Sequence, residues 1–380
     1  MIKIIENSQK NSSGFGYMVN DILKEVSKEH ETYLITHQIS NGYSDTYIAL
    51  KHTWWDILKG IRLKNLISGL KLMFNASASM GNKLKYLYYY IGSKSIENSI
   101  EKIKPDVIHI HGLTLQTKPI IELCEKKKLK YIVTLHGLIG LDESTNASKA
   151  DKMYEKEGLL FLENNRRQVT VVSSGVKQRI IEYYGLNGKN IKVILNGTSF
   201  NMKDNHFVDS NIINFMCIGT ICKRKNQIQL VRCCSELPMN IKKRIKIHLI
   251  GKNSENINIE EEIEKRNLKD IVIYHGFIPR EEIEKLWRTA SFNIVMSKDE
   301  GFGLSIIEGY AHGVPTITFY DIDAVKDLYS EETMELIESR SDKAVIDTIE
   351  KVINSKKWNR SRIMEFAKNY SMDVIAFSIR

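Results

Sequence analysis

The sequence has few cysteines and no long hydrophobic run. Its five cysteines, an odd number scattered along 380 residues, form neither a disulfide framework nor a paired CxxC metal site, which favours a reducing compartment. No apolar run reaches the roughly 18 residues of a membrane-spanning helix, and the first ten residues, MIKIIENSQK, lack the pattern of a secretion signal. We therefore expect a cytoplasmic protein that is neither exported nor threaded through a membrane.

Internal repeats and low-complexity segments are also absent. The composition, 42% hydrophobic and 27% charged, is typical of a globular protein. A length of 380 residues exceeds what one hydrophobic core usually organises. The sequence therefore predicts two domains of under roughly 200 residues each.

The net charge of +9 is distributed unevenly. Residues 51–104 contain ten Lys/Arg and three Asp/Glu, a net +7, with aromatic residues at 54–55 and 86–90. Cations among aromatic rings favour peripheral contact with an anionic surface, here the inner face of the cell membrane. The alternative is a pair of amphipathic helices with a solvated basic face. Nucleic acid is not expected as a partner, because no zinc-finger spacing or RNP-type motif is present.

Short β-rich apolar runs alternate with helix-length segments. They occupy 2–5, 32–36, 106–112, 131–137, 169–174 and 191–197, and after a polar stretch they resume at 213–219, 245–251, 271–277, 292–297 and 316–319. Continuously apolar strands separated by helices indicate parallel sheets with helices on both faces. The pattern predicts an α/β fold of two doubly wound, Rossmann-like domains facing across a cleft.

The polar stretch at 198–211 predicts a linker near residue 200. We expect an N-terminal domain over 1–200 and a C-terminal domain over 205–357. The amphipathic tail, 358–380, is expected to be helical and to cross back onto the first domain.

The segment EGFGLSIIE, residues 300–308, follows the predicted strand at 292–297. In open parallel sheets, ligands bind beyond the carboxyl ends of the strands. The run from Leu304 to His312 predicts a helix that stops at Gly313, with a proline two residues later. Such a helix directs its first amides and the positive end of its dipole at the preceding loop, which makes an anion-binding site.

Two glycines and two acids surround this predicted anion site. Gly301 and Gly303 carry no side chain that would keep a phosphate from the amides. Glu308, one turn into the helix, is placed to accept hydroxyl hydrogens from a ribose, and Glu300 to hold the hydroxyls of whatever the phosphate carries. The alternative is that Glu300 is a solvated loop acid and Glu308 only favours the helix dipole.

The longer stretch EGFGLSIIEGYAHGVP resembles the E-x7-E signature of retaining GT-B glycosyltransferases of family 4. INFMCIGTICKRKNQIQLV (213–231) is similar to the strand and phosphate loop of this family, and IVIYHGFIPREEIEKLW (271–287) to its nucleobase strand. VSSGVKQRI and VILNG are similar to the segments that close the first domain. The resemblance implies transfer of a hexose-type sugar, with retention, from a nucleoside diphosphate sugar, with UDP favoured. It also implies that the domain over 1–200 binds the acceptor and the domain over 205–357 binds the nucleotide sugar. It implies no metal and no other cofactor.

The cation loop departs from the family pattern. The family carries an arginine after the strand glycine and a lysine five residues later; here Thr220 follows Gly219, while Lys225 stands at the lysine position. Lys225 is expected to stabilise the charge of the leaving diphosphate. Arg224 is a candidate to replace the arginine missing at Thr220. The alternative is that the KRK stretch is a solvated turn that does not contact the donor.

The first domain opens with NSSGFGYMVNDIL, residues 11–23. As a dinucleotide fingerprint this stretch is weak, because Val19 occupies the third glycine position and no acid follows the second strand as expected. In the resembling family the loop borders the donor phosphates, where Gly14 and Gly16 let the backbone approach.

Histidines end two neighbouring predicted strands. The resemblance implies that His136 contacts the transferred sugar, and we assign His111 to acceptor binding. Buried structural histidines are the alternative for both. His109 shares a face with His111 at a spacing of two, but no third ligand is evident, so zinc is not expected.

The resemblance thus implies three catalytic residues: Glu300, which orients the sugar, His136, which steadies it, and Lys225. Donor binding is expected at Gly14, Gly16, Arg224, Lys225, Phe277, Ile278, Glu300, Phe302, Gly303, Leu304, Ser305 and Glu308. The expected acceptor is a lipid-linked or cell-surface glycan. Two alternatives are an NAD-dependent Rossmann oxidoreductase, disfavoured by the missing third glycine and ribose acid, and a glycan-binding pseudoenzyme, favoured only by Thr220.

Overall fold

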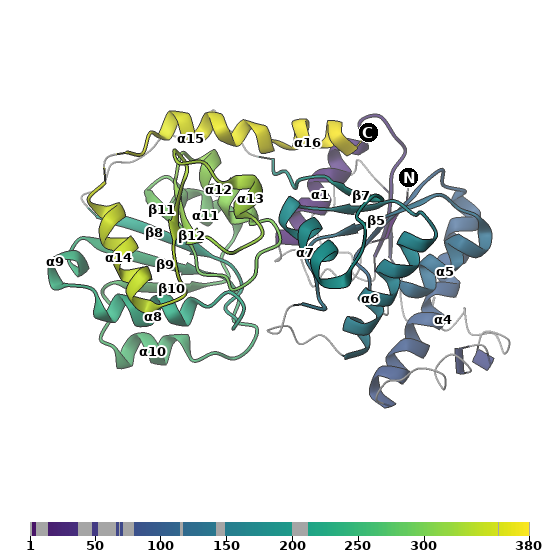
Figure 1. The fold of residues 1–380 in the computed structure, drawn as a ribbon, viewed down its shortest axis with the longest axis horizontal. Coiled ribbons are helices and arrows are strands. Elements are labelled where there is room, and N and C mark those ends of the chain that lie inside the picture. Colours follow the sequence, from purple (N-terminus) through teal and green to yellow (C-terminus); the bar gives the residue numbers. More distant parts are fainter. Residues whose placement is uncertain are drawn as a thin grey trace. The chain divides into compact units, whose positions relative to one another are not determined.

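The computed structural model describes residues 2–4, 14–36, 48–51, 66–67, 69–70, 80–114, 117–141, 149–199, 212–355 and 357–379. The chain forms two compact units, Met1–Leu195 with Ile379–Arg380, and Asn196–Ser378. Each unit is built on one parallel sheet with helices packed against it (Figure 1). The predicted α/β architecture of two doubly wound sheets is confirmed.

The first unit contains a seven-stranded sheet with the order β3-β2-β1-β4-β5-β6-β7. Its strands are β1 (Ile2–Ile4), β2 (Tyr33–Thr36), β3 (Ile48–Lys51), β4 (Ile108–His111), β5 (Tyr131–Leu135), β6 (Val169–Val171) and β7 (Ile191–Val193). Its helices are α1 (Gly14–Val26), α4 (Met80–Ile103), α5 (Lys118–Lys127), α6 (Lys149–Asn164) and α7 (Ser174–Tyr184). Its core is formed by residues such as Ile108, Ile110, Val133 and Leu135, which are almost fully buried, as the continuously apolar runs predict.

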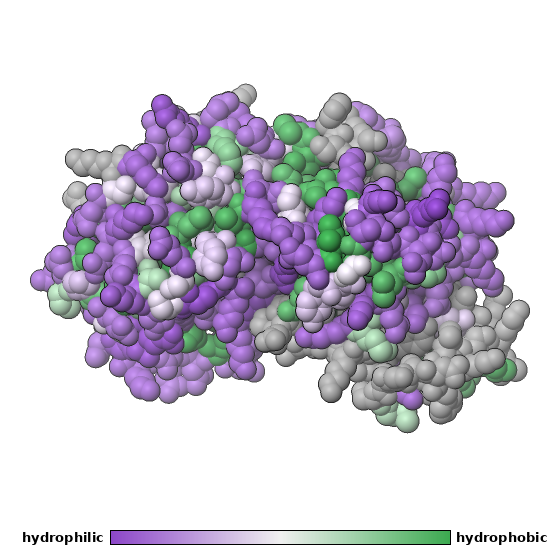
Figure 2. Space-filling view, viewed as in Figure 1, coloured by the Kyte–Doolittle hydropathy of each residue, from purple (hydrophilic) through white to green (hydrophobic). Residues whose placement is uncertain are grey.

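The second unit contains a six-stranded sheet with the order β10-β9-β8-β11-β12-β13. Its strands are β8 (Ile213–Ile218), β9 (Ile245–Ile250), β10 (Val272–Gly276), β11 (Ala290–Val295), β12 (Thr316–Phe319) and β13 (Met334–Ile337). Helix α8 (Gln227–Glu236) contacts both α10 (Ile259–Lys265) and α14 (Asp342–Ile353), and α12 (Leu304–Ala311) packs on α15 (Arg360–Ala367). The unit also contains α9 (Met239–Lys242), α11 (Arg280–Trp287) and α13 (Val325–Leu328). On the face drawn in Figure 2, hydrophilic side chains predominate over α10, which carries four glutamates.

Two strands, β3 and β13, are missing from the sequence prediction. Each pairs with a single neighbour, β3 with β2 and β13 with β12, so each is an edge strand. Both are four residues long, and the sequence of β13, MELI, carries a glutamate. Edge strands need less continuous hydrophobicity than central ones, so their sequences give a weaker signal.

The C-terminal tail differs from its predicted assignment to the first domain. Helix α15, the turn η2 (Lys368–Tyr370) and nearly all of α16 (Met372–Ile379) belong to the second unit, which extends to Ser378. The reason is aromatic packing: Phe366 contacts Tyr310 with ring centroids 5.8 Å apart, and the Tyr370 hydroxyl donates to the Asp327 carbonyl at 2.6 Å. These contacts bury one side of the tail against α12 and α13.

The basic stretch is only partly described. Its second half forms α4, which contacts α5 of its own unit, whereas residues 54–55 lie outside the described residues. Within the part of the chain that the structure describes, no helix combines the length and the hydropathy needed to cross a membrane.

Candidate functional site

The central loops of the second unit meet where the strand order reverses. Strand β8 lies between β9 and β11, so the loops that follow β8 and β11 leave the sheet side by side at its carboxyl edge. The Lys298 amide donates to the Arg224 carbonyl at 2.8 Å, which ties the two loops together. This is the position in a doubly wound sheet where ligands bind.

An acid and two cations meet at this junction. Lys225, from the loop after β8, forms an ion pair with Glu300, from the loop after β11. The Ser297 hydroxyl donates to the same Glu300 oxygen at 3.1 Å. Arg224 Nη1 lies 3.9 Å from this oxygen and donates to the Asp299 carbonyl at 2.8 Å. The structure therefore brings Lys225, Arg224 and Glu300 into one cluster, in which Arg224 is not a solvated turn residue.

The electrostatics of this cluster keep Glu300 ionised. Burial disfavours its charged form, but the charges of Lys225 and Arg224 and the hydrogen bonds from Lys225 and Ser297 outweigh burial and lower the pKa of Glu300. The side chains of Glu300 and Lys225 are only 15% and 16% exposed. The alternative of a solvated loop acid is therefore wrong for Glu300.

The predicted helix after the glycine loop is present. Helix α12 begins at Leu304, preceded by Gly303 with φ 85°, and the chain turns out of it through Gly313 with φ 68°. Phe302 is buried and packs beside Tyr370 with a centroid distance of 6.3 Å, which fastens the loop to the C-terminal segment. The first amides of α12, at Leu304 and Ser305, thus follow a loop whose conformation requires glycine.

Two residues that sequence reasoning missed hold these loops in place. Arg340, after β13, donates to the Ser297 carbonyl at 2.7 Å and to the Lys298 carbonyl at 3.2 Å, with its guanidinium 4.0 Å from the Phe319 ring centroid. Gln227 donates to the Thr220 carbonyl at 3.1 Å. Arg340 contacts backbone atoms 43 and 42 residues away in sequence, so no local motif marks it. Gln227 contacts a carbonyl only seven residues away, within the stretch 213–231 that resembles the family's phosphate loop, and that stretch is the signal that could have found it.

Glu308 lies in α12, one turn after Leu304, and is partly exposed. Its carbonyl accepts from His312 Nδ1 at 2.8 Å, and His312 Nε2 lies 2.7 Å from a Glu284 carboxylate oxygen. The His312 ring stacks on Trp287 with centroids 5.6 Å apart. The far end of α12 is thus attached to α11.

The predicted nucleobase strand is β10, and the two assigned residues after it differ in exposure. Phe277 is 55% exposed, whereas Ile278 packs against the cluster that contains Met216 and Trp287. Within this strand, His275 Nε2 lies 2.9 Å from His248 Nδ1 of β9.

Three histidines, the buried His109 and His111 of β4 and the partly exposed His136 directly after β5, form a row. His111 Nδ1 lies 2.8 Å from His136 Nε2, and the His109 ring stacks on His111 with centroids 4.2 Å apart. His109 Nε2 contacts the Thr134 hydroxyl at 2.5 Å. The structure therefore brings His111 and His136 together, although sequence reasoning gave them separate roles.

Gly14 and Gly16 lie in the first turn of α1, whereas the residues between β1 and Gly14 lie outside the described residues. Among the described residues, no group of three or more His, Cys, Asp or Glu side chains is arranged to hold a metal ion. All five cysteines are buried free thiols.

Two family models match the chain. Glycosyl transferases group 1 matches residues 200–370, and Glycosyltransferase Family 4 matches residues 75–201. An uncharacterized glycosyltransferase of Methanocaldococcus jannaschii is 27% identical over 237 residues, 62% of each chain. O-antigen chain mannosyltransferase B of Escherichia coli is 32% identical over 101 residues, 26% of each chain. The aligned stretches span less than two thirds of both relatives.

Solved structures with the same fold cover the whole chain. Sucrose-phosphate synthase from Thermosynechococcus elongatus aligns over 100% of this chain and 96% of its own, with a TM-score of 0.77 and 17% identity. Anabaena HepE, in complex with UDP and glucose, aligns over 100% and 97%, with a TM-score of 0.70 and 15% identity. These likenesses establish the fold, and they confirm the predicted GT-B architecture.

Proposed function

Because this chain belongs to the glycosyl transferases group 1 family and has the two-domain GT-B fold, we propose that it transfers a hexose-type sugar from a nucleoside diphosphate sugar to a glycan hydroxyl. The O-antigen mannosyltransferase among its relatives supports a role in polysaccharide or lipopolysaccharide biosynthesis. UDP is the proposed nucleotide, since HepE, which shares the fold, is in complex with UDP and glucose.

One observation carries the proposal: an ionised and largely buried carboxylate, Glu300, is held by Lys225 and Arg224 in the loop before α12. A diphosphate at this end of the helix would interact with its first amides and with both cations. When the diphosphate takes up these cations, the Glu300 carboxylate is released to accept hydroxyl hydrogens of the sugar. Glu308, one turn along the helix, is proposed to hold the ribose.

The cations then stabilise the negative charge that develops on the leaving group during the reaction. As the bond between the anomeric carbon and the diphosphate breaks, negative charge develops on the leaving phosphate, and Lys225, Arg224 and the α12 dipole stabilise it without a metal. We propose attack from the same face, with retention, in which the departing diphosphate accepts the proton of the acceptor hydroxyl. His136 steadies the sugar, and its contact with His111 fixes the orientation of its ring.

The basic stretch supports an acceptor at an anionic membrane surface. Met80 and Leu84 lie one turn apart on α4 and are 63% and 55% exposed, and Ile67 is 59% exposed. Apolar side chains exposed among lysines are typical of interfacial helices. Flotation with phosphatidylglycerol vesicles tests this: Met80→Asp with Leu84→Asp should abolish binding, and Met239→Asp, an equally exposed methionine of the second unit, should not.

The function is tested with nucleotides and then with sugars. Isothermal titration of UDP, GDP, ADP, CMP and NAD identifies the base, and we expect UDP to bind. Release of UDP from UDP-sugars, with and without lipid-linked glycan acceptors, identifies the donor. Binding of NAD but of no nucleoside diphosphate would refute the proposal. Binding of a UDP-sugar without hydrolysis or transfer would instead indicate a glycan-binding protein without activity.

A further inference from the structure

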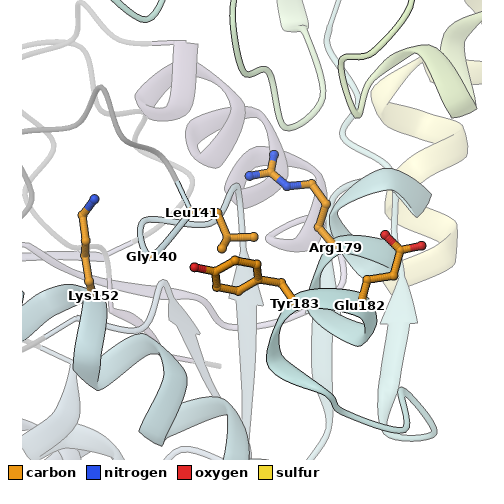
Figure 3. A pocket seen from close by; sticks show the side chains of 6 residues that line it. All are labelled: Gly140, Leu141, Lys152, Arg179, Glu182 and Tyr183. Atoms are coloured by element: carbon orange, nitrogen blue, oxygen red, sulfur yellow. The ribbon is translucent and has the colours of Figure 1, made fainter.

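The first unit has a hollow that none of the sequence motifs predicts. It has a volume of about 600 Å³ and is lined by Gly140, Leu141, Lys152, Arg179, Glu182 and Tyr183 (Figure 3). These residues come from the loop after β5, the first turn of α6, and α7. The volume is within the roughly 300–1,000 Å³ of small-molecule sites in general.

The loop wall of this hollow is held rigidly. The buried carboxylate of Glu155, 1% exposed, accepts hydrogen bonds from the amides of Ile139 at 2.8 Å and Gly140 at 2.7 Å, and from the Tyr184 hydroxyl at 2.8 Å. A Cβ atom on Gly140 would lie 2.1 Å from the Tyr184 hydroxyl oxygen, so this position admits no side chain without displacement. The wall that Gly140 and Leu141 form is therefore fixed against α6 and α7, as in a preformed binding site.

The lining combines positive charge with an exposed aromatic ring. Among the described lining residues there are two cations, Lys152 and Arg179, and one acid, Glu182, and the charge of Arg179 also acts on the buried Glu155 carboxylate beneath the loop. Tyr183 is 67% exposed and packs edge-on against Tyr184 with centroids 5.4 Å apart. In Figure 3 the Tyr183 hydroxyl is directed toward the Gly140 side of the hollow, and the Arg179 guanidinium projects above Leu141.

This chemistry matches a sugar that carries a phosphate. The guanidinium of Arg179 can bind phosphate oxygens through two parallel hydrogen bonds, and the Lys152 ammonium, across the hollow in Figure 3, adds a second positive charge at its rim. The ring of Tyr183 offers a flat apolar surface with a hydroxyl at its edge, on which one face of a pyranose ring can pack. Glu182, which accepts from Gln178 along α7, can take hydroxyl hydrogens of the sugar.

We propose that this hollow is an acceptor subsite that binds a phosphate group next to a sugar ring, an inference that rests on the proposed glycosyltransferase function. Arg179 binds the phosphate, Lys152 adds positive charge from the opposite side of the hollow, and Tyr183 packs against the ring. The phosphate belongs either to the glycan itself or to the diphosphate of a lipid carrier, and the two sources share this recognition chemistry.

Isothermal titration with saturating UDP, which occupies the proposed donor site, tests the subsite. The probes are glucose 6-phosphate, glucose, and geranyl diphosphate, which carries a diphosphate but no sugar. The double variant Lys152→Gln with Arg179→Gln should weaken binding of at least one phosphate probe about tenfold or more, and 0.5 M salt should weaken it in the wild type. The matched control, Lys189→Gln with Lys192→Gln, removes two exposed charges of the same unit and should leave binding unchanged.

The same titrations distinguish a phosphate on the glycan from one on the lipid carrier, and they distinguish failure of the subsite from failure of the proposed glycosyltransferase function. If the double variant loses affinity for glucose 6-phosphate, and Tyr183→Ala also lowers that affinity, the phosphate belongs to the glycan. If the double variant loses affinity only for geranyl diphosphate, the phosphate belongs to the lipid carrier. The subsite is refuted if the wild type and the double variant have equal affinities for both phosphate probes. It is also refuted if the wild type binds glucose and glucose 6-phosphate equally well and does not bind geranyl diphosphate. UDP affinity and melting temperature should stay at wild-type values in every variant. A wild type that binds no nucleoside diphosphate would instead refute the proposed function.

Discussion

Replacement of Lys225 by methionine tests the cation cluster most directly. Methionine keeps much of the volume of the side chain but removes the charge that pairs with Glu300. The remaining cation, Arg224, has its Nη1 atom 3.9 Å from the Glu300 carboxylate, a separation worth about 4 kcal/mol of attraction at an effective dielectric constant of about 20. The guanidinium therefore compensates for part of the loss.

The expected effects on stability and on catalysis differ in size. Removing one partner of a fully buried pair costs about 3–5 kcal/mol. Glu300 and Lys225 retain 15% and 16% exposure, and Arg224 stays in place, so we expect the free energy of unfolding to fall by only about 1–2 kcal/mol. In catalysis, loss of a preorganised charge at the leaving group lowers kcat by about 10²–10³-fold.

The assay measures UDP release from the donor sugar by stopped time points, together with urea unfolding of the same samples. Lys223→Met is the matched control, since Lys223 is exposed and only two residues away, and it should change kcat by less than about threefold. The double variant Lys225→Met with Glu300→Gln leaves no unpaired buried carboxylate, so its stability should return toward the wild type while its activity stays low.

Two results would contradict this reasoning. If Lys225→Met and Lys223→Met have the same kcat, then Lys225 does not stabilise the leaving group, and its ion pair with Glu300 is structural. If the double variant is as unstable as Lys225→Met, then the carboxylate of Glu300 is not the source of the destabilisation.

Three further predictions concern the same unit. Glu308→Ala should weaken UDP binding about tenfold by calorimetry because it removes the proposed ribose acceptor, and unchanged affinity would contradict that role. Arg340→Met should raise KM for the donor severalfold, since it frees the Ser297 and Lys298 carbonyls, with Arg362→Met as a surface control. Burial and the neighbouring His275 lower the pKa of His248 to about 4. Between about pH 6.5 and pH 4, the His248 ring is therefore neutral in the folded protein but protonated in the unfolded chain. The free energy of unfolding in urea should therefore fall as the pH drops from about 6.5 to about 4, and His248→Gln should reduce this slope.

Much of the second unit could be predicted from local sequence. The apolar runs that became β8, β9, β10, β11 and β12 are continuous, because strands buried on both faces need an apolar residue at nearly every position. The start of α12 after Gly303 and the turn at Gly313 followed from residues that tolerate positive φ. The edge strand β13 was missed, because it pairs on one side only and carries little of this signal.

The sequence by itself determined the two sheets, the glycine loop and the helix beyond it, since these depend on hydrophobic periodicity and on the backbone freedom of particular residues. Only the tertiary structure decided that Lys225 meets Glu300 across 75 residues with Arg224 beside it, and that Arg340 holds the loop that carries Glu300. It also decided that the C-terminal helices pack on the second unit and that Lys152, Arg179 and Tyr183 surround one hollow. Contacts between residues distant in sequence depend on how the sheets and helices are stacked, which no local pattern records.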